Sequence, residues 1–86
     1  MTRSEIEAKL REILVNDFRV APEKVTNDAT FRGTLGLDSL DAVDFIYLAT
    51  TAFSIKKDLE AFRELHTFAK VTDYIESEVK KHASSS

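Results

Sequence analysis

Hydrophobic residues recur at intervals of three and four along most of this chain, which is the spacing that places them on one face of a helix. The pattern predicts helices over residues 3–17, over residues 39 to 51 or 53, over residues 57–65 as a short element, and from residue 68 onward. Residues 19–37 contain the single proline and both glycines, so we expect a long loop there, with one helical turn near Pro22. The predicted fold is all-α, a four-helix bundle with three longer helices and one short helix.

Capping residues support these boundaries. Thr2 with Glu5 and Ser4 with Glu7 offer two overlapping capping boxes for the first helix. Thr67 stands where it can cap the last helix. The side chains that can cap a helix therefore occur where the hydrophobic pattern begins.

The second helix has an unusual start. Asp38 is its expected N-cap, Asp41 can bond back in a variant of the capping box, and Ser39 lies in the first turn. The first amides of a helix lack partners within it and lie at the positive end of its dipole, so this end favours a phosphate. The residues alone leave two interpretations open: an ordinary helix start, or a serine presented on a rigid support.

Composition narrows the class of protein. Its 86 residues make one domain, expected over residues 1–82 with residues 83–86 as a frayed polar tail. The chain has no cysteine, which excludes disulfides and thiolate metal sites, and we expect a reducing cytoplasm. A net charge of −3 without a basic stripe argues against nucleic acid and favours partners with basic faces. No apolar run is long enough to predict a membrane span.

A hydrolase with Ser39 as nucleophile would need a neighbouring base and an oxyanion hole. No glycine follows two residues after Ser39, so the strand-to-helix elbow motif is absent. His66 and His82 are the only histidines: His66 stands before the last helix, and His82 stands next to the expected tail. We therefore expect neither an enzyme nor a metal site.

Residues 35–41, Leu-Gly-Leu-Asp-Ser-Leu-Asp, resemble the attachment motif of acyl carrier proteins. Phe53 and the segment Asp-Tyr-Ile at residues 73–75 extend the resemblance to about residues 3–80. The resemblance implies a bundle of the acyl-carrier type and a non-catalytic carrier. It also implies that a phosphopantetheinyl transferase attaches 4′-phosphopantetheine from coenzyme A to Ser39. The chain would then be a phosphoprotein whose arm holds acyl cargo as a thioester for fatty acid, lipid or polyketide biosynthesis.

The resemblance also assigns roles to neighbouring residues. Asp38 flanks the arm, and a docking surface for loading, elongating or transferring enzymes with basic faces is expected at Leu40, Asp41, Asp44 and Tyr47. A space for the acyl chain is expected between the second and third helices. Its expected borders are Phe45, Leu48, Phe62 and Leu65, although Phe45 and Phe62 could equally fill it. We expect the carrier to be a monomer.

The sequence departs from common family members at several positions. Arg32 stands where acidic or apolar residues are frequent, and residues 50–52, Thr-Thr-Ala, replace an acidic run before Phe53. Lys56 and Lys57 follow, so either the surface has drifted or the chain serves a specialised rather than a housekeeping pathway. Asp-Ser-Leu favours acyl cargo, while a peptidyl or aminoacyl carrier and an unmodified helical interaction module stay open as alternatives.

Overall fold

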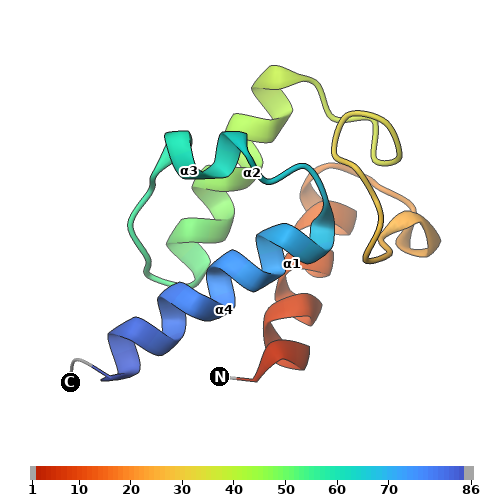
Figure 1. Cartoon of the computed structure of the whole chain (residues 1–86). Helices are drawn as coiled ribbons and strands as arrows, with labels where there is room; N and C mark the ends of the chain where they lie inside the picture. Colours follow the sequence, from red (N-terminus) through yellow and green to blue (C-terminus); the bar gives the residue numbers. More distant parts are fainter. Residues whose placement is uncertain (1, 85–86) are drawn as a thin grey trace.

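The computed structural model describes residues 2–84, and within them the fold is entirely helical, without a β-strand (Figure 1). Its elements are α1 (Arg3–Asp17), the single turn η1 (Pro22–Lys24), α2 (Ser39–Ala52), α3 (Leu59–Arg63) and α4 (Phe68–Ser84). The predicted all-α bundle with one short helix is confirmed. α4 continues to Ser84 and so extends into the expected tail of residues 83–86, of which residues 85–86 lie outside the described part.

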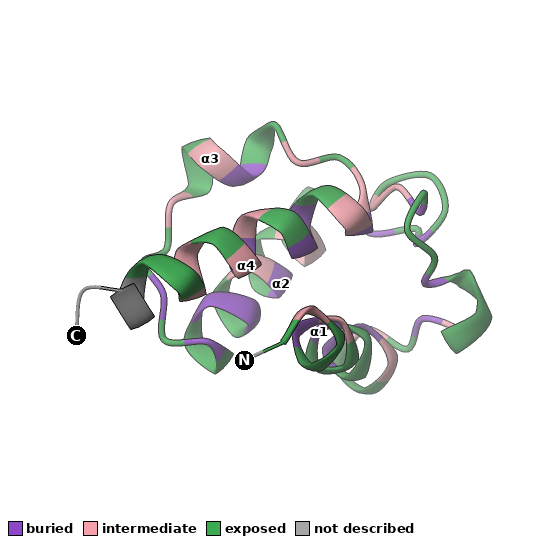
Figure 2. Ribbon diagram, turned by 60° about the horizontal axis from the view of Figure 1, so that its bottom comes forward, coloured by how far each residue is buried: buried purple, intermediate pink, exposed green. Residues whose placement is uncertain are grey.

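The core lies where α1 meets α2 and α4, while α3 packs against α2. Figure 2 shows the buried faces of these helices turned toward one another. The buried residues from the three longer helices include Ile6, Leu10, Leu14, Phe45, Ala49, Phe68, Val71 and Ile75. Two buried threonines do not disturb this core, because Thr50 and Thr72 each donate a hydrogen bond of 2.8 Å to the carbonyl one turn earlier. No helix in residues 2–84 combines the length and the apolar character that a membrane span requires.

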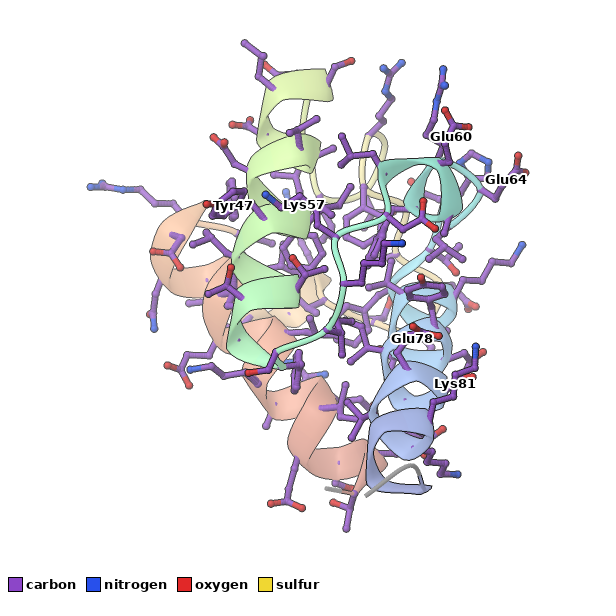
Figure 3. All side chains as sticks on the ribbon, turned by 90° about the vertical axis from the view of Figure 1, so that its left-hand side faces the viewer. Tyr47, Lys57, Glu60, Glu64, Glu78 and Lys81 are labelled. Carbon is purple, nitrogen blue, oxygen red and sulfur yellow. The ribbon has the colours of Figure 1, made fainter. Side chains whose placement is uncertain are left out.

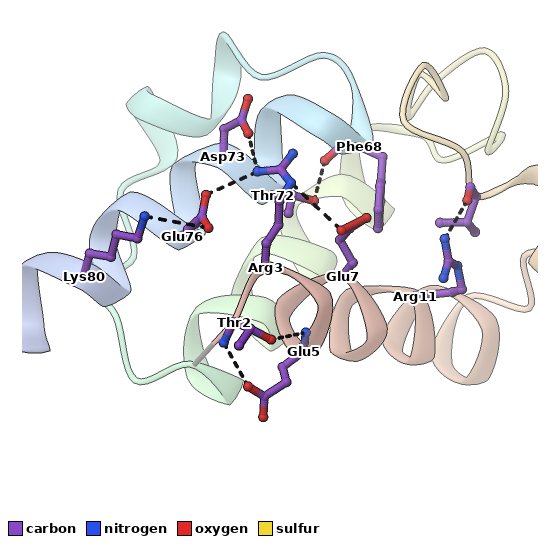
Figure 4. Close-up of polar contacts among 11 residues, drawn as sticks. Thr2, Arg3, Glu5, Glu7, Arg11, Phe68, Thr72, Asp73, Glu76 and Lys80 are labelled. Atoms are coloured by element: carbon purple, nitrogen blue, oxygen red, sulfur yellow. Dashed lines mark hydrogen bonds and ion pairs between the residues drawn. The ribbon is translucent and has the colours of Figure 1, made fainter.

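Several ion pairs lie on the surface of α4. Glu78 and Lys81 pair at 3.0 Å along the helix (Figure 3). Arg3 reaches across from α1 to Asp73 and, at 3.3 Å, to Glu76 (Figure 4). The hydrogen bond that Arg3 donates to the Asp73 carboxylate raises the pKa of Arg3. Such exposed pairs contribute little to stability, so we attribute the α1–α4 packing mainly to the buried side chains.

The N-terminus of α1 has one capping box rather than two. The Thr2 amide donates to Glu5 Oε1 at 2.8 Å, and the Glu5 amide donates to Thr2 Oγ1 at 3.2 Å (Figure 4). The hydrogen bond from the Thr2 amide lowers the pKa of Glu5. The prediction of a second capping box, Ser4 with Glu7, is wrong. α1 already begins at Arg3, which places Ser4 inside the helix.

The third helix is shorter than the predicted 57–65. It spans Leu59–Arg63, and Asp58 caps it by accepting a hydrogen bond of 3.2 Å from the Ala61 amide. Phe62 is buried and meets Tyr74 of α4 edge to face, with 5.0 Å between ring centroids. Leu59, by contrast, is 43% exposed and lines the groove between α2 and α3.

Candidate functional site

The long loop that leads into α2 is fastened to the start of α4. Three backbone hydrogen bonds join residues 27–31 to residues 66–69: Phe68 N–H to Ala29 O at 2.9 Å, Ala69 N–H to Asn27 O at 3.1 Å, and Phe31 N–H to His66 O at 3.3 Å. The first amides of a helix have no partners within it, so the loop satisfies donors that α4 leaves free. We call these three bonds the loop tie. The tie holds the segment before Ser39 against the rest of the fold.

The last turn of this loop depends on Gly36. Its φ of +67° lies in the left-handed region that side chains rarely adopt. The residues on either side, Leu35 and Leu37, are buried, and their amides donate to Thr30 O at 3.0 Å and Phe31 O at 2.8 Å. Gly36 therefore lets the chain reverse between two anchored leucines directly before α2.

Changing Gly36 to alanine should destabilise the protein by about 1–2 kcal/mol, the usual cost of a left-handed conformation for a residue with a Cβ. The penalty comes from the backbone, because an added Cβ would have no neighbour within 4 Å. Urea denaturation of the two proteins measures the difference. An unchanged midpoint and slope would show that the turn does not need a glycine.

Ser39 is exposed in the first turn of α2. Asp38 is the N-cap, as predicted, and its carboxylate accepts a hydrogen bond of 2.9 Å from the Asp41 amide. The reciprocal bond expected from the Asp41 side chain is not formed within the described residues. In that same part of the chain the amides of Ser39 and Leu40 have no hydrogen-bond partner, as expected for a helix start. The serine hydroxyl therefore stands beside unused donors.

Arg32 also contacts the serine. Its Nη2 donates a hydrogen bond of 2.6 Å to Ser39 Oγ. Arg32, Gly36, Leu37, Asp38 and Ser39 together line a shallow, open pocket of about 400 Å³. Sequence reasoning noted Arg32 only as a departure from a family pattern and gave it no role. The sequence does show a cation seven residues before Ser39, but whether Arg32 contacts the serine depends on the path of the loop.

The outer face of α2 is exposed to solvent. Leu40 is 78% exposed and Tyr47 is 55% exposed, and Asp44 is exposed on the same helix. Asp41 is partly covered in the first turn. Residues three and four positions apart share a helix face, so the residues expected to form a docking surface do lie together. Val43 and Leu48 are further exposed apolar residues of α2.

A lysine covers part of this outer face. Lys57 Nζ lies 3.3 Å from the centroid of the Tyr47 ring, in the geometry of a cation–π contact (Figure 3). The segment after α2 therefore folds back so that a positive charge lies over its outer face. The beginning of α2 has only acidic charges, Asp38, Asp41 and Asp44. The exposed face thus changes from acidic to basic along its length.

A groove of about 870 Å³ runs between α2 and α3 and reaches Ser39. Phe62 and Leu65 line it, but the expectation that Phe45 and Leu48 also border this space is wrong. Phe45 is 2% exposed and lies in the core, where its ring centroid lies 6.2 Å from that of Phe18 and 5.3 Å from that of Phe31. On the α2 side the groove is lined by Ala42, Val43 and Ile46.

Comparison with known proteins agrees with this geometry. Residues 8–75 match the family model described as a phosphopantetheine attachment site. The acyl carrier protein of Akkermansia muciniphila is 40% identical over 76 residues, which cover 88% of this chain and 95% of that protein. The acyl carrier protein of Thermosynechococcus vestitus is 35% identical over 79 residues, covering 92% and 98%.

The fold has a counterpart among solved structures. The structure of the acyl carrier protein from Enterococcus faecalis aligns with a TM-score of 0.76 and 27% identity, over 91% of this chain and 99% of that one. The family model and both relatives cover most of the chain, and the family's domain carries 4′-phosphopantetheine. The resemblance identified from the serine motif is confirmed, and the chain belongs to the acyl carrier protein family.

Proposed function

We propose that this chain carries acyl intermediates as thioesters on a 4′-phosphopantetheine arm attached to Ser39. The observation that carries the proposal is the position of the Ser39 hydroxyl, which is exposed at the start of a rigid helix. Free amides at that helix start and the Arg32 guanidinium supply donors that suit a phosphodiester anion. The Asp38 carboxylate is already engaged by the Asp41 amide. When bound, the arm supplies the thiol that holds the acyl chain.

A loading experiment tests the attachment. The purified protein is incubated with coenzyme A and a broad-specificity phosphopantetheinyl transferase, and its intact mass is then measured. In the reaction, Ser39 Oγ forms a bond to phosphorus, the pyrophosphate bond of coenzyme A breaks, adenosine bisphosphate leaves and the serine proton is released. We expect a gain of one phosphopantetheine on the peptide that contains Ser39. A folded protein that gains no mass would contradict the proposal.

We further propose that the groove between α2 and α3 receives part of the acyl chain. Its walls present Val43 and Ile46 from α2 and Phe62 from α3, all apolar, and its near end lies at Ser39. An arm attached to Ser39 therefore starts beside an apolar surface, and burial of methylene groups there is favourable. Phe45 is buried in the core and does not line this groove, so it leaves the space open.

Partner enzymes are proposed to dock on the exposed face of α2 through Leu40, Asp41, Asp44 and Tyr47. The acidic residues would steer enzymes with basic faces, whereas the exposed apolar side chains would supply contact area. Lys57 over Tyr47 places a positive charge on the second half of this surface, and Lys56 precedes it. A partner that needs acidic charge along the whole helix is therefore disfavoured, which fits a specialised pathway.

Reversing the charges of Lys56 and Lys57 to glutamate should lower the KM of a basic-faced phosphopantetheinyl transferase for this carrier. The expected change is about two- to fivefold at low salt, since each exposed charge pair contributes about 0–1 kcal/mol. Steady-state loading kinetics measure it, and added salt should reduce the difference. Glutamates at Lys24 and Lys70, which lie outside α2 and the segment after it, change the net charge equally and serve as control. Equal effects of the two double variants on the KM would contradict a specific role of Lys56 and Lys57 in docking.

A further inference from the structure

A positive charge faces the proposed attachment point from the loop. Arg32 Nη2 donates to Ser39 Oγ at 2.6 Å, and both side chains are exposed to solvent. Among the described residues, no carboxylate lies within ion-pair distance of Arg32. The guanidinium has five N–H donors in a planar fork, so most of them stay available after the contact with the serine.

The neighbours of Arg32 fix its position. The Phe31 amide donates to His66 O at 3.3 Å, Phe31 O accepts a hydrogen bond of 2.8 Å from the Leu37 amide, and the Phe31 ring packs on Phe45. On the other side, the chain passes so close to Thr30 that a Cβ at Gly33 would lie 2.6 Å from Thr30 Oγ1. Arg32 therefore projects from a turn that is anchored on both sides, and its reach to Ser39 follows from this anchoring.

We propose that Arg32 binds the phosphodiester of the arm once Ser39 carries it. This inference rests on the proposed attachment to Ser39. Modification turns Ser39 Oγ into a bridging oxygen and places a negative charge on the adjacent non-bridging oxygens. Those oxygens are bonded to the same phosphorus atom as Ser39 Oγ, which Arg32 already contacts at 2.6 Å. A guanidinium–phosphate hydrogen bond is charge-assisted and stronger than the bond to a neutral hydroxyl that it replaces.

The contact would also set where the arm begins. Arg32 and Ser39 line both the shallow pocket at the helix start and the near end of the groove between α2 and α3. A phosphate held by Arg32 and by the free amides of Ser39 and Leu40 has donors on two sides. The arm is then fixed at its root beside the groove, while its remaining atoms stay mobile. Arg32 is in this sense a positioning residue for the cargo.

The test compares wild type, Arg32→Gln and Arg63→Gln, each loaded enzymatically and checked by intact mass. Arg63 is the matched control because it is an exposed arginine on the same groove, paired with Glu60 at 3.5 Å. The ³¹P NMR spectrum of the loaded protein reports on the single phosphodiester. In Arg32→Gln we expect the ³¹P resonance to shift toward that of free phosphopantetheine, and we expect Arg63→Gln to leave it at the wild-type position. Added salt should move the wild-type resonance in the same direction as Arg32→Gln.

The possible outcomes separate this inference from the function on which it rests. If all three proteins gain the arm but their ³¹P resonances coincide, the phosphate contact is refuted and attachment at Ser39 stands. If Arg63→Gln shifts the resonance as much as Arg32→Gln, the effect is a general change of charge, which also refutes it. If the wild type gains no mass, both proposals fail together. Arg32→Lys keeps the charge without the planar fork and should give an intermediate shift.

Discussion

Replacing Ser39 with alanine is expected to abolish loading completely and to leave the fold intact. The hydroxyl would be the only atom that accepts the arm, so its removal leaves nothing to modify. Ser39 is exposed, and Asp38 keeps its capping bond to the Asp41 amide, so the free energy of unfolding should change by no more than about 0.5 kcal/mol. Intact mass after incubation with coenzyme A and the transferase measures loading, and urea denaturation measures stability.

The matched control for this variant is Ser4→Ala. Ser4 is also an exposed serine near the start of a helix, but it lies in α1. We expect this variant to gain one phosphopantetheine at the wild-type rate. A mass gain in Ser39→Ala would show that the arm is not attached where the motif places it. A loss of loading in both variants would show that the loss is not specific to Ser39.

Replacing Phe45 with alanine should have the largest effect on stability, a loss of about 3–5 kcal/mol. Phe45 is 2% exposed and packs against the rings of Phe18 and Phe31, so its removal leaves a cavity where α1, the loop and α2 meet. A domain of 86 residues has about 4–13 kcal/mol of total stability, so the variant would lose a large share of it. The urea midpoint measures the loss.

Leu40→Ala is the control for this second variant, because Leu40 lies on the same helix but is 78% exposed. Its free energy of unfolding should stay within about 0.5 kcal/mol of wild type. Comparing the two variants also tests whether Phe45 lies in the core or in the groove between α2 and α3. A Phe45→Ala protein with wild-type stability and altered affinity for its acyl cargo would place Phe45 in the groove, contrary to the structure.

The starts of α1 and α2 could be predicted from the sequence because they depend on neighbouring residues. Thr2 with Glu5 marks the start of α1, and Asp38 marks the start of α2. The walls of the groove could not be predicted in the same way. α2 has apolar residues on nearly all sides, and Phe45 and Ile46, adjacent in sequence, point about 100° apart around the helix. Only packing against α1 decides that Phe45 enters the core while Ile46 faces the groove.

The contact between Arg32 and Ser39 could not be predicted from the sequence for a related reason. The two residues are seven positions apart, and part of the intervening chain is a loop whose path no periodicity describes. That path is set by Gly36, by buried Leu35 and Leu37, and by the bonds to residues 66–69. The serine motif therefore indicates which residue is modified, whereas tertiary structure decides which side chain stands beside it.

The loop tie has a consequence for the order of events during synthesis. Ribosomes make the chain from its N-terminus, so residues 27–31 and Ser39 emerge before residues 66–69 exist. Until then, the segment before the serine lacks the three bonds of the loop tie. The attachment end therefore takes its final shape only after residues 66–69 have been translated.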